Sequence, residues 1–160
     1  KYRKTFGLPE RLSPVEEREG ALGPWYANTL NAGSQRMLHY MSGPSLLSVI
    51  IPLRDRRSAE QRFVAALREL LGALDVPERY VDLEAGCMGV IQHGRASDRS
   101  KLGSLRDQAY TASYDFYDGL SLALINRRAA MTPCGPMAYK SPEYVAPMLL
   151  EQTWRLTAAN

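Results

Sequence analysis

An almost continuous apolar run, LLSVIIPL, occupies residues 46–53. Its length and its β-branched residues are typical of a strand that is buried on both faces, so we place it at the centre of a sheet. Two strands are predicted ahead of it, at residues 25–30 and 36–41, because the turn signals NAGS and SGP separate the three segments. Together they predict an antiparallel meander.

Two shorter patterns extend this sheet. Residues 2–12 predict a short strand followed by a turn at Pro9, and residues 88–92 predict another strand. The expected sheet therefore has four or five strands.

Helical spacing of apolar residues begins after an S-x-x-Q capping box at residues 58–61. The apolar positions that then recur every three or four residues are Phe63, Leu67, Leu70 and Leu74. A D-x-x-E box at residues 75–78 predicts a second, shorter helix that ends near Gly86.

Three more helices are predicted in the second half of the chain. Residues 102–117 carry tyrosines at helical spacing, and the apolar residues 120–131 are rich in Ala and Leu, which favours a helix over a strand. Ser141 and Pro142 fit the N-cap and first position of a last helix. We therefore expect an α+β fold, a mostly antiparallel sheet of four or five strands packed by three to five helices, in a single domain over residues 1–160.

Composition narrows the class of protein. With 45% hydrophobic and 23% charged residues, the chain has the composition of a globular protein rather than of a disordered one. No apolar run approaches the roughly 20 residues that span a bilayer, so we expect no membrane association. The first residues, KYRK, are not followed by the apolar stretch that a secretory signal requires, and a processed leader stays open. The two cysteines lie far apart in the sequence, which we expect of a reduced, cytoplasmic protein.

The net charge of +3 is small for a nucleic-acid-binding protein. Basic residues cluster at positions 54–57 and again at 95–106. Such clusters are more often solvated surface than binding sites.

Four segments in order resemble a known family: LGPWYAN (22–28), SLLSVIIP (45–52), GRASDRS (94–100) and TPCGPMAYKSP (132–142). Together they resemble an uncharacterised bacterial family that is known only as a domain of unknown function. One departure is GSLRD at residues 103–107, where the family pattern reads GSMND. The resemblance implies a small stand-alone bacterial protein and brings no activity, cofactor or catalytic residue.

Cys134 is the candidate nucleophile. It lies in a loop rich in Pro and Gly ahead of the last predicted helix, whose dipole would stabilise a thiolate. His93 or His39 would act as its base, and Asp98 or Asp107 would orient that base. The alternative is that Cys134 is a small buried residue in a rigid turn.

Metal-binding and nucleotide-binding motifs do not occur in the sequence. It contains no C-x-x-C, H-x-x-x-H, P-loop, G-x-G-x-x-G or G-x-S-x-G pattern. We therefore expect neither a metal nor a cofactor.

The polar segment at residues 94–103 and the start of the next helix form the candidate ligand-binding site. Its anion-directed donors are Arg95, Ser97, Arg99, Lys101 and Arg106. The alternative is that these residues cap the helix and pair with nearby acids such as Asp98 and Asp107.

Aromatic residues allow two further interpretations. Trp25 and Tyr26, with the row of Tyr110, Tyr114 and Tyr117, form a stacking platform for bases in one and core or interface residues in the other.

We favour a binding or regulatory module of a bacterial cytoplasm, whose partner is another protein or an anionic ligand, nucleic acid included. The reason is that the sequence contains one cationic loop and no set of residues arranged for catalysis. The alternative is a small cysteine-dependent enzyme that uses Cys134 with His93 as base. Catalysis and assembly into homo-oligomers both stay open at this point.

Overall fold

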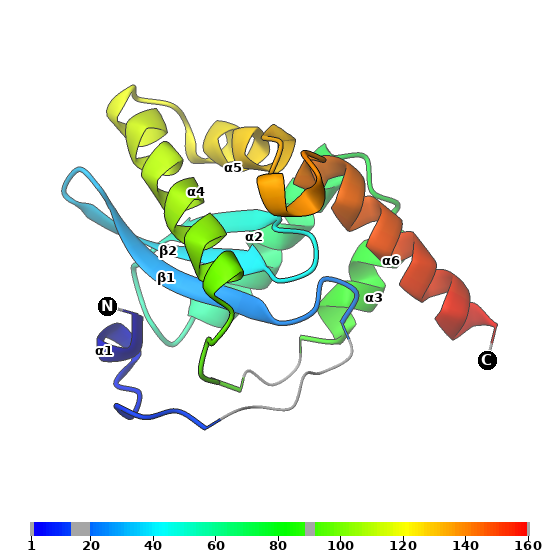
Figure 1. Cartoon of the computed structure of the whole chain (residues 1–160), viewed down its shortest axis with the longest axis horizontal. Helices are drawn as coiled ribbons and strands as arrows, with labels where there is room; N and C mark the ends of the chain where they lie inside the picture. The colour runs from blue at the N-terminus through cyan, green and yellow to red at the C-terminus, as the bar shows by residue number, and fades with distance from the viewer. Residues whose placement is uncertain (1, 14–19, 89–91, 160) are drawn as a thin grey trace.

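The computed structural model describes residues 2–13, 20–88 and 92–159 (Figure 1). The strands are β1 (Trp25–Ala32), β2 (Gln35–Ser42) and β3 (Ser48–Pro52). The helices are α1 (Tyr2–Phe6), α2 (Ala59–Ala73), α3 (Glu78–Gly86), α4 (Arg99–Tyr117), α5 (Leu122–Met131), the short 3-10 helix η1 (Gly135–Met137) and α6 (Pro142–Ala158). The α+β fold class is confirmed.

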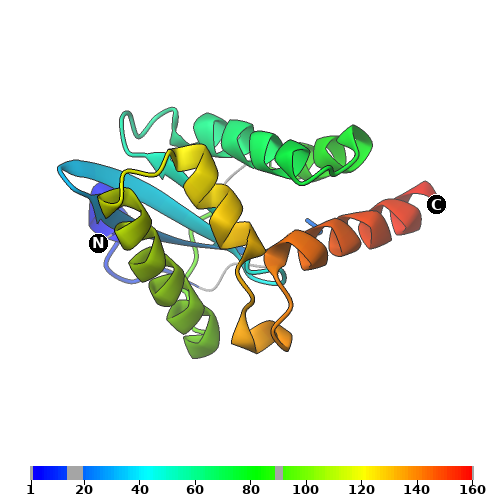
Figure 2. The same cartoon turned by 90° about the horizontal axis from the view of Figure 1, so that it is seen from above.

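The sheet is an antiparallel meander in the order β1–β2–β3, as predicted. Its central strand is β2, however, and not the segment at residues 46–53, of which β3 is a part. β3 is nevertheless buried on both faces, because α2 packs against one face, while α5 lies along its free edge and packs Ile125 against Ile50 on the other face (Figure 2). The apolar run therefore indicates that both faces of this strand are buried, and not that the strand is central in the sheet.

A side chain closes the free edge of β3. Asn126 in α5 accepts a hydrogen bond from the Ile50 N–H at 2.9 Å and donates one to the Ile50 carbonyl at 3.1 Å. These are the two bonds that a neighbouring strand would supply at this residue. At Ile50 the edge is thus satisfied without a further strand.

The structure has three described strands, fewer than the four or five predicted. The N-terminal segment is the helix α1, in which Tyr2 and Phe6 stack with ring centroids 4.5 Å apart. Side chains four residues apart meet in a helix and not in a strand. The strand predicted at 88–92 falls mainly on residues 89–91, which lie outside the described residues.

With α1 included, the described residues form six α-helices, one more than the upper end of the prediction. The helices predicted at 102–117 and 120–131 are confirmed as α4 and α5, and α6 begins at Pro142 as predicted. No helix in the described part of the chain combines the length and the apolar character needed to cross a membrane.

α2 and α3 form as predicted, but without the predicted capping boxes. Ser58 makes no side-chain cap bond, and its hydroxyl accepts from Arg62 Nε at 3.3 Å instead. Asp75 has a φ of 57° and ends α2 rather than capping α3. There the Val76 N–H bonds to the Leu71 carbonyl at 3.0 Å, as in a Schellman motif.

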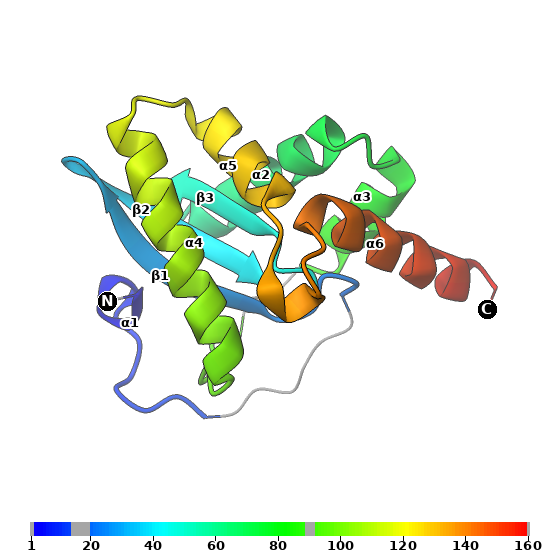
Figure 3. The ribbon, with the colours of Figure 1, turned by 45° about the horizontal axis from the view of Figure 1, so that its top comes forward.

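The sheet lies between two helical layers, α2 on one face and α4 with α5 on the other (Figure 3). The main core fills the space under α2 and includes Leu38, Tyr40, Val49, Ile51, Phe63, Leu67 and Leu71. Alternate residues of β2 point the other way, so Met37 and Met41 join two smaller apolar clusters with residues of α4 and α5. This arrangement leaves the outer edge of β1 to α1 and to two loops, and the candidate site lies there.

Candidate functional site

A cavity of about 1320 Å³ opens beside β1, between α1, the start of α4 and the loops at residues 8–12 and 92–97. We call it the β1 cavity. Ligand sites in proteins commonly have volumes of several hundred Å³. The β1 cavity therefore has room for a small molecule.

One wall of the β1 cavity is aromatic. Trp25 on β1 packs edge-on against Phe63 of α2 at 4.9 Å, and Phe63 contacts the Tyr40 ring at 4.5 Å. Tyr40 in turn meets Tyr2 of α1 edge-on at 6.2 Å. The four residues line the cavity as one continuous group of rings from three different layers of the fold.

Several polar groups of this wall are neutral donors. Burial raises the pKa of both Tyr2 and Tyr40 above the ordinary tyrosine value, so both phenols stay protonated at neutral pH. The indole N–H of Trp25 is buried and has no hydrogen-bond partner in the part of the chain that the structure describes. An unpaired buried donor costs roughly 1–3 kcal/mol.

Charged side chains of both signs line the β1 cavity, and the acidic ones are Glu10, Glu60 and Glu84. Arg3, Arg11 and Arg95 line the β1 cavity. The Arg95 N–H donates to the Ser13 carbonyl at 3.3 Å, which ties the loop at residues 92–97 to the N-terminal segment. His93 lies against the rings of α1, with its centroid 6.1 Å from that of Tyr2. The backbone of Arg95 is thus tied to the N-terminal segment, while its side chain is exposed.

Glu84 of α3 is the buried acid of the β1 cavity, and its role is structural. Its carboxylate accepts hydrogen bonds from the N–H groups of Ala21 at 2.8 Å and Leu22 at 3.3 Å. Burial raises the pKa of Glu84, and these two hydrogen bonds oppose the rise. The side chain therefore anchors the loop that leads into β1.

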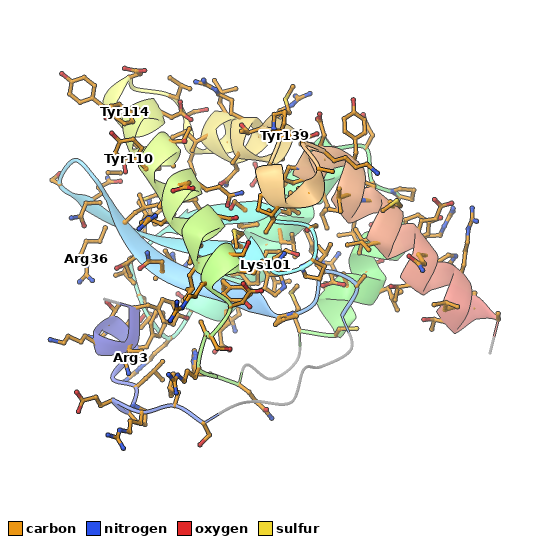
Figure 4. All side chains as sticks on the ribbon, in the orientation of Figure 1. Arg3, Arg36, Lys101, Tyr110, Tyr114 and Tyr139 are labelled. Atoms are coloured by element: carbon orange, nitrogen blue, oxygen red, sulfur yellow. The ribbon has the colours of Figure 1, made fainter. Side chains whose placement is uncertain are left out.

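The structure brings only part of the predicted ligand site together. Arg95 and Ser97 line the β1 cavity, whereas Arg99, Lys101 and Arg106 belong to α4 and are not among its lining residues. Figure 4 shows Lys101 near the start of α4.

The capping alternative explains the acids near this segment. Asp98 Oδ1 accepts from the N–H groups of Ser100 at 2.9 Å and Lys101 at 3.1 Å, so Asp98 is the N-cap of α4. The Arg106 guanidinium lies 3.8 Å from the Asp107 carboxylate on the exposed side of the helix. Exposed pairs of this kind contribute little.

Cys134 lies before η1, seven residues ahead of Ser141, and outside the lining of the β1 cavity. Its thiol donates to the Thr132 carbonyl at 3.4 Å and accepts from the Gln108 amide at 3.9 Å. Burial raises the pKa of the thiol, and the Gln108 contact offsets part of that rise. A raised pKa keeps the thiol protonated, which is the opposite of what a nucleophile requires.

His93, the predicted base, makes no hydrogen bond to Cys134 in the residues that the structure describes. The ring contacts of His93 are with Tyr2 and Phe6. The pairing of Cys134 with His93 stays a prediction.

A buried polar network connects the other histidine toward Cys134. The Ser48 hydroxyl donates to Gln108 Oε1, so it accepts the hydrogen bond from His39 Nε2, which is 2.8 Å away. His39 Nε2 therefore carries a proton, and Nδ1 has no hydrogen-bond partner among the residues that the structure describes. Burial lowers the pKa of His39 to about 4. Its position inside a strand gave the sequence analysis no signal for this network.

The tyrosine row lies on the exposed surface of α4, so its interpretation as core is wrong for this chain. Tyr110 and Tyr117 are 65% and 89% exposed. The hydroxyls of Tyr110 and Tyr114 lie 2.6 Å apart (Figure 4). Trp25 packs with Phe63 under α2, on the other face of the sheet, so it does not share a platform with the row.

Sequence reasoning missed the aromatic wall and two of the three arginines of the β1 cavity. One signal was available, because Tyr2 and Phe6 have the spacing of a helical pair. Within the ranges that the structure describes, no three His, Cys, Asp or Glu residues are placed to hold a metal ion.

Comparisons with known proteins give a family but no activity. No curated protein and no solved structure matches the chain. A family model described as a domain of unknown function, DUF6933, matches residues 1–145, which is most of the chain. The protein therefore belongs to this family of unknown function.

Proposed function

We propose that the protein is a binding module for a small anionic molecule that carries an aromatic ring, and that this molecule occupies the β1 cavity. The bacterial and cytoplasmic setting predicted from the sequence belongs to the same proposal. The observation that carries it is a cavity of about 1320 Å³ that is lined by four aromatic rings and by three arginines, Arg3 of α1 and Arg11 and Arg95 of the loops.

Each wall supports one part of the ligand. A planar ring gains from contact with Trp25 and Phe63, because aromatic pairs add about 0.5–1.5 kcal/mol beyond the area they bury. The Arg95 guanidinium can form paired hydrogen bonds with a carboxylate or phosphate.

The two tryptophans provide the reporter and its internal control. The chain contains two, Trp25 in the β1 cavity and Trp154 on α6, where it packs against Tyr80 at 5.9 Å. An NMR spectrum of the ¹⁵N-labelled protein resolves the two indole N–H signals, and Trp154→Phe assigns them. Phenyl phosphate and benzoate are the first probes, with inorganic phosphate and benzyl alcohol as the charge-only and ring-only controls.

We expect phenyl phosphate to move the Trp25 signal and to leave that of Trp154 in place, while both controls act only at much higher concentration. Arg95→Gln should weaken binding about tenfold through loss of a charged hydrogen bond. The matched variant Arg155→Gln removes the same charge from α6 and should bind as the wild type does. Equal weakening by both variants, or a Trp25 signal that responds to none of the probes, would contradict the proposal.

A further inference from the structure

A second hollow lies on the other side of α1. It has a volume of about 710 Å³ and lies between α1, the turn from β1 to β2 and the loop after β3. Four of its lining residues are cationic: Lys4, Arg36, Arg54 and Arg56. None of the acidic residues that the structure describes lines it, and we call it the basic cleft. Figure 4 shows Arg36 on the side of the sheet where α1 lies.

Hydrogen bonds hold the segments on both sides of the cleft in place. Arg36 Nη2 donates to the Thr5 hydroxyl of α1 at 2.8 Å, and the Leu53 N–H donates to the Arg36 carbonyl at 2.8 Å. Arg62 of α2 holds the loop after β3 through hydrogen bonds to the carbonyls of Pro52 and Asp55. The guanidinium of Arg62 is thus used by the loop itself, which leaves Arg54 and Arg56 to line the cleft.

The positive charge of the cleft is not neutralised within the described residues. The acid closest in sequence, Asp55, does not line the cleft, and its Oδ1 accepts from the Arg57 N–H at 3.1 Å. No ion pair in the described ranges involves Lys4, Arg36, Arg54 or Arg56. Like charges that share a hollow repel one another, whereas a bound anion attracts each of them.

We propose that the basic cleft binds a compact polyanion with two or more linked phosphate groups. Arginine guanidinium groups match phosphate oxygens in paired hydrogen bonds, and a lysine adds a point charge. No aromatic ring lines the cleft, so nothing there stacks on a base. This separates its ligand class from that of the β1 cavity, and the two proposals stand or fall independently.

Inorganic tripolyphosphate is the probe, titrated calorimetrically into the full chain at about 0.1 M salt, where distant charges are screened. We expect one molecule to bind per chain, and sulfate at equal ionic strength to bind far more weakly. The double variant Arg54→Gln with Arg56→Gln should lose about tenfold or more in affinity, because it removes two guanidinium groups that form paired hydrogen bonds with phosphate oxygens. Both side chains are exposed, so the variant should fold.

The matched control is Arg127→Gln with Arg155→Gln, which removes two exposed arginines from α5 and α6. It should bind tripolyphosphate within about twofold of the wild type, since it lowers only the net charge. The indole signals of Trp25 and Trp154 report whether each variant is folded. Equal losses in both double variants, or no binding by the wild type, would overturn the proposal. The proposal would also be overturned if a short single-stranded oligonucleotide bound more tightly than tripolyphosphate and lost this binding in the Arg54/Arg56 variant. The ligand of the cleft would then be nucleic acid.

Discussion

The two faces of the sheet are covered by helices in different ways. Under α2, the buried side chains are almost all apolar, as Leu38 and Ile51 of the sheet and Leu67 of the helix illustrate. Under α4 and α5, the strands present His39 and Ser48, and the helices meet them with polar side chains. One face is therefore held mainly by burial of apolar area and the other partly by directed hydrogen bonds.

This difference has a physical consequence. Apolar contact is non-directional and does not depend on pH, so it tolerates small shifts of the helix. A buried hydrogen bond fixes position and becomes costly when one partner is lost or changes its protonation state. We therefore expect the α2 face to supply most of the stability and the α4–α5 face to supply its sensitivity to pH.

The largest effect should come from the α2 face. Leu67 is 1% exposed, and Leu67→Ala should lower the free energy of unfolding by about 4 kcal/mol through lost burial and the cavity left behind. Urea denaturation followed by circular dichroism measures this loss, which should be equal at pH 5 and pH 7. Leu124 of α5 is half exposed, and Leu124→Ala is the control, expected to change stability by less than about 0.5 kcal/mol. A loss in Leu67→Ala as small as in the control would show that the α2 face is not the main core.

The next effect belongs to the other face and depends on pH. His39 has a pKa of about 4 in the fold and an ordinary value of 6.5 when unfolded, so the unfolded chain takes up a proton first as the pH falls. The stability that neutral His39 provides is complete above pH 6.5 and is lost as the pH falls toward 4, a change on the order of 3 kcal/mol. Unfolding measured across this interval, and the NMR titration of the His39 ring, both test it.

Two variants separate His39 from other titrating groups. His39→Gln should be less stable at neutral pH and should lose less stability across that pH interval. Glu84 acts in the opposite direction, because its raised pKa makes its contribution largest below the ordinary value of 4.5 and smaller as the pH rises. Glu84→Gln should therefore steepen the loss of stability on acidification. A midpoint for the His39 ring near 6.5 would contradict the assignment of a neutral, buried imidazole.

The same contrast explains which parts of the fold the sequence predicted. The hairpins were predictable because NAGS and SGP are local turn signals, and α4, α5 and α6 because their patterns are local as well. The central strand was misassigned because the apolar run of β3 results from its burial by α2 and α5. The arrangement of these helices around β3 is set by the tertiary structure and is not visible in the sequence. The helix α1 was missed because the stacking of Tyr2 on Phe6 competes with the β-propensity of both residues.

The candidate site divides in the same manner. Arg95 and Ser97 were predictable, since a polar loop before a helix is visible in the sequence. The ring wall was not, because Tyr2, Trp25 and Phe63 come from three elements that the fold alone brings together. Charge patterning also did not distinguish the basic cleft from a solvated surface, because only the assembled fold shows that no acid among the described residues lines it.

The smallest effect concerns the bond that ends the sheet. Asn126→Ala leaves the N–H and the carbonyl of Ile50 without their partner on a buried strand and should cost about 2 kcal/mol. Hydrogen exchange at the Ile50 amide should accelerate, which loss of packing elsewhere would not do selectively. Asn31→Ala, at an exposed position of β1, is the matched control and should leave both quantities unchanged. If Ile50 kept its protection in Asn126→Ala, then burial under α2 and α5 alone would hold β3, and the two faces would be more alike than their side chains indicate.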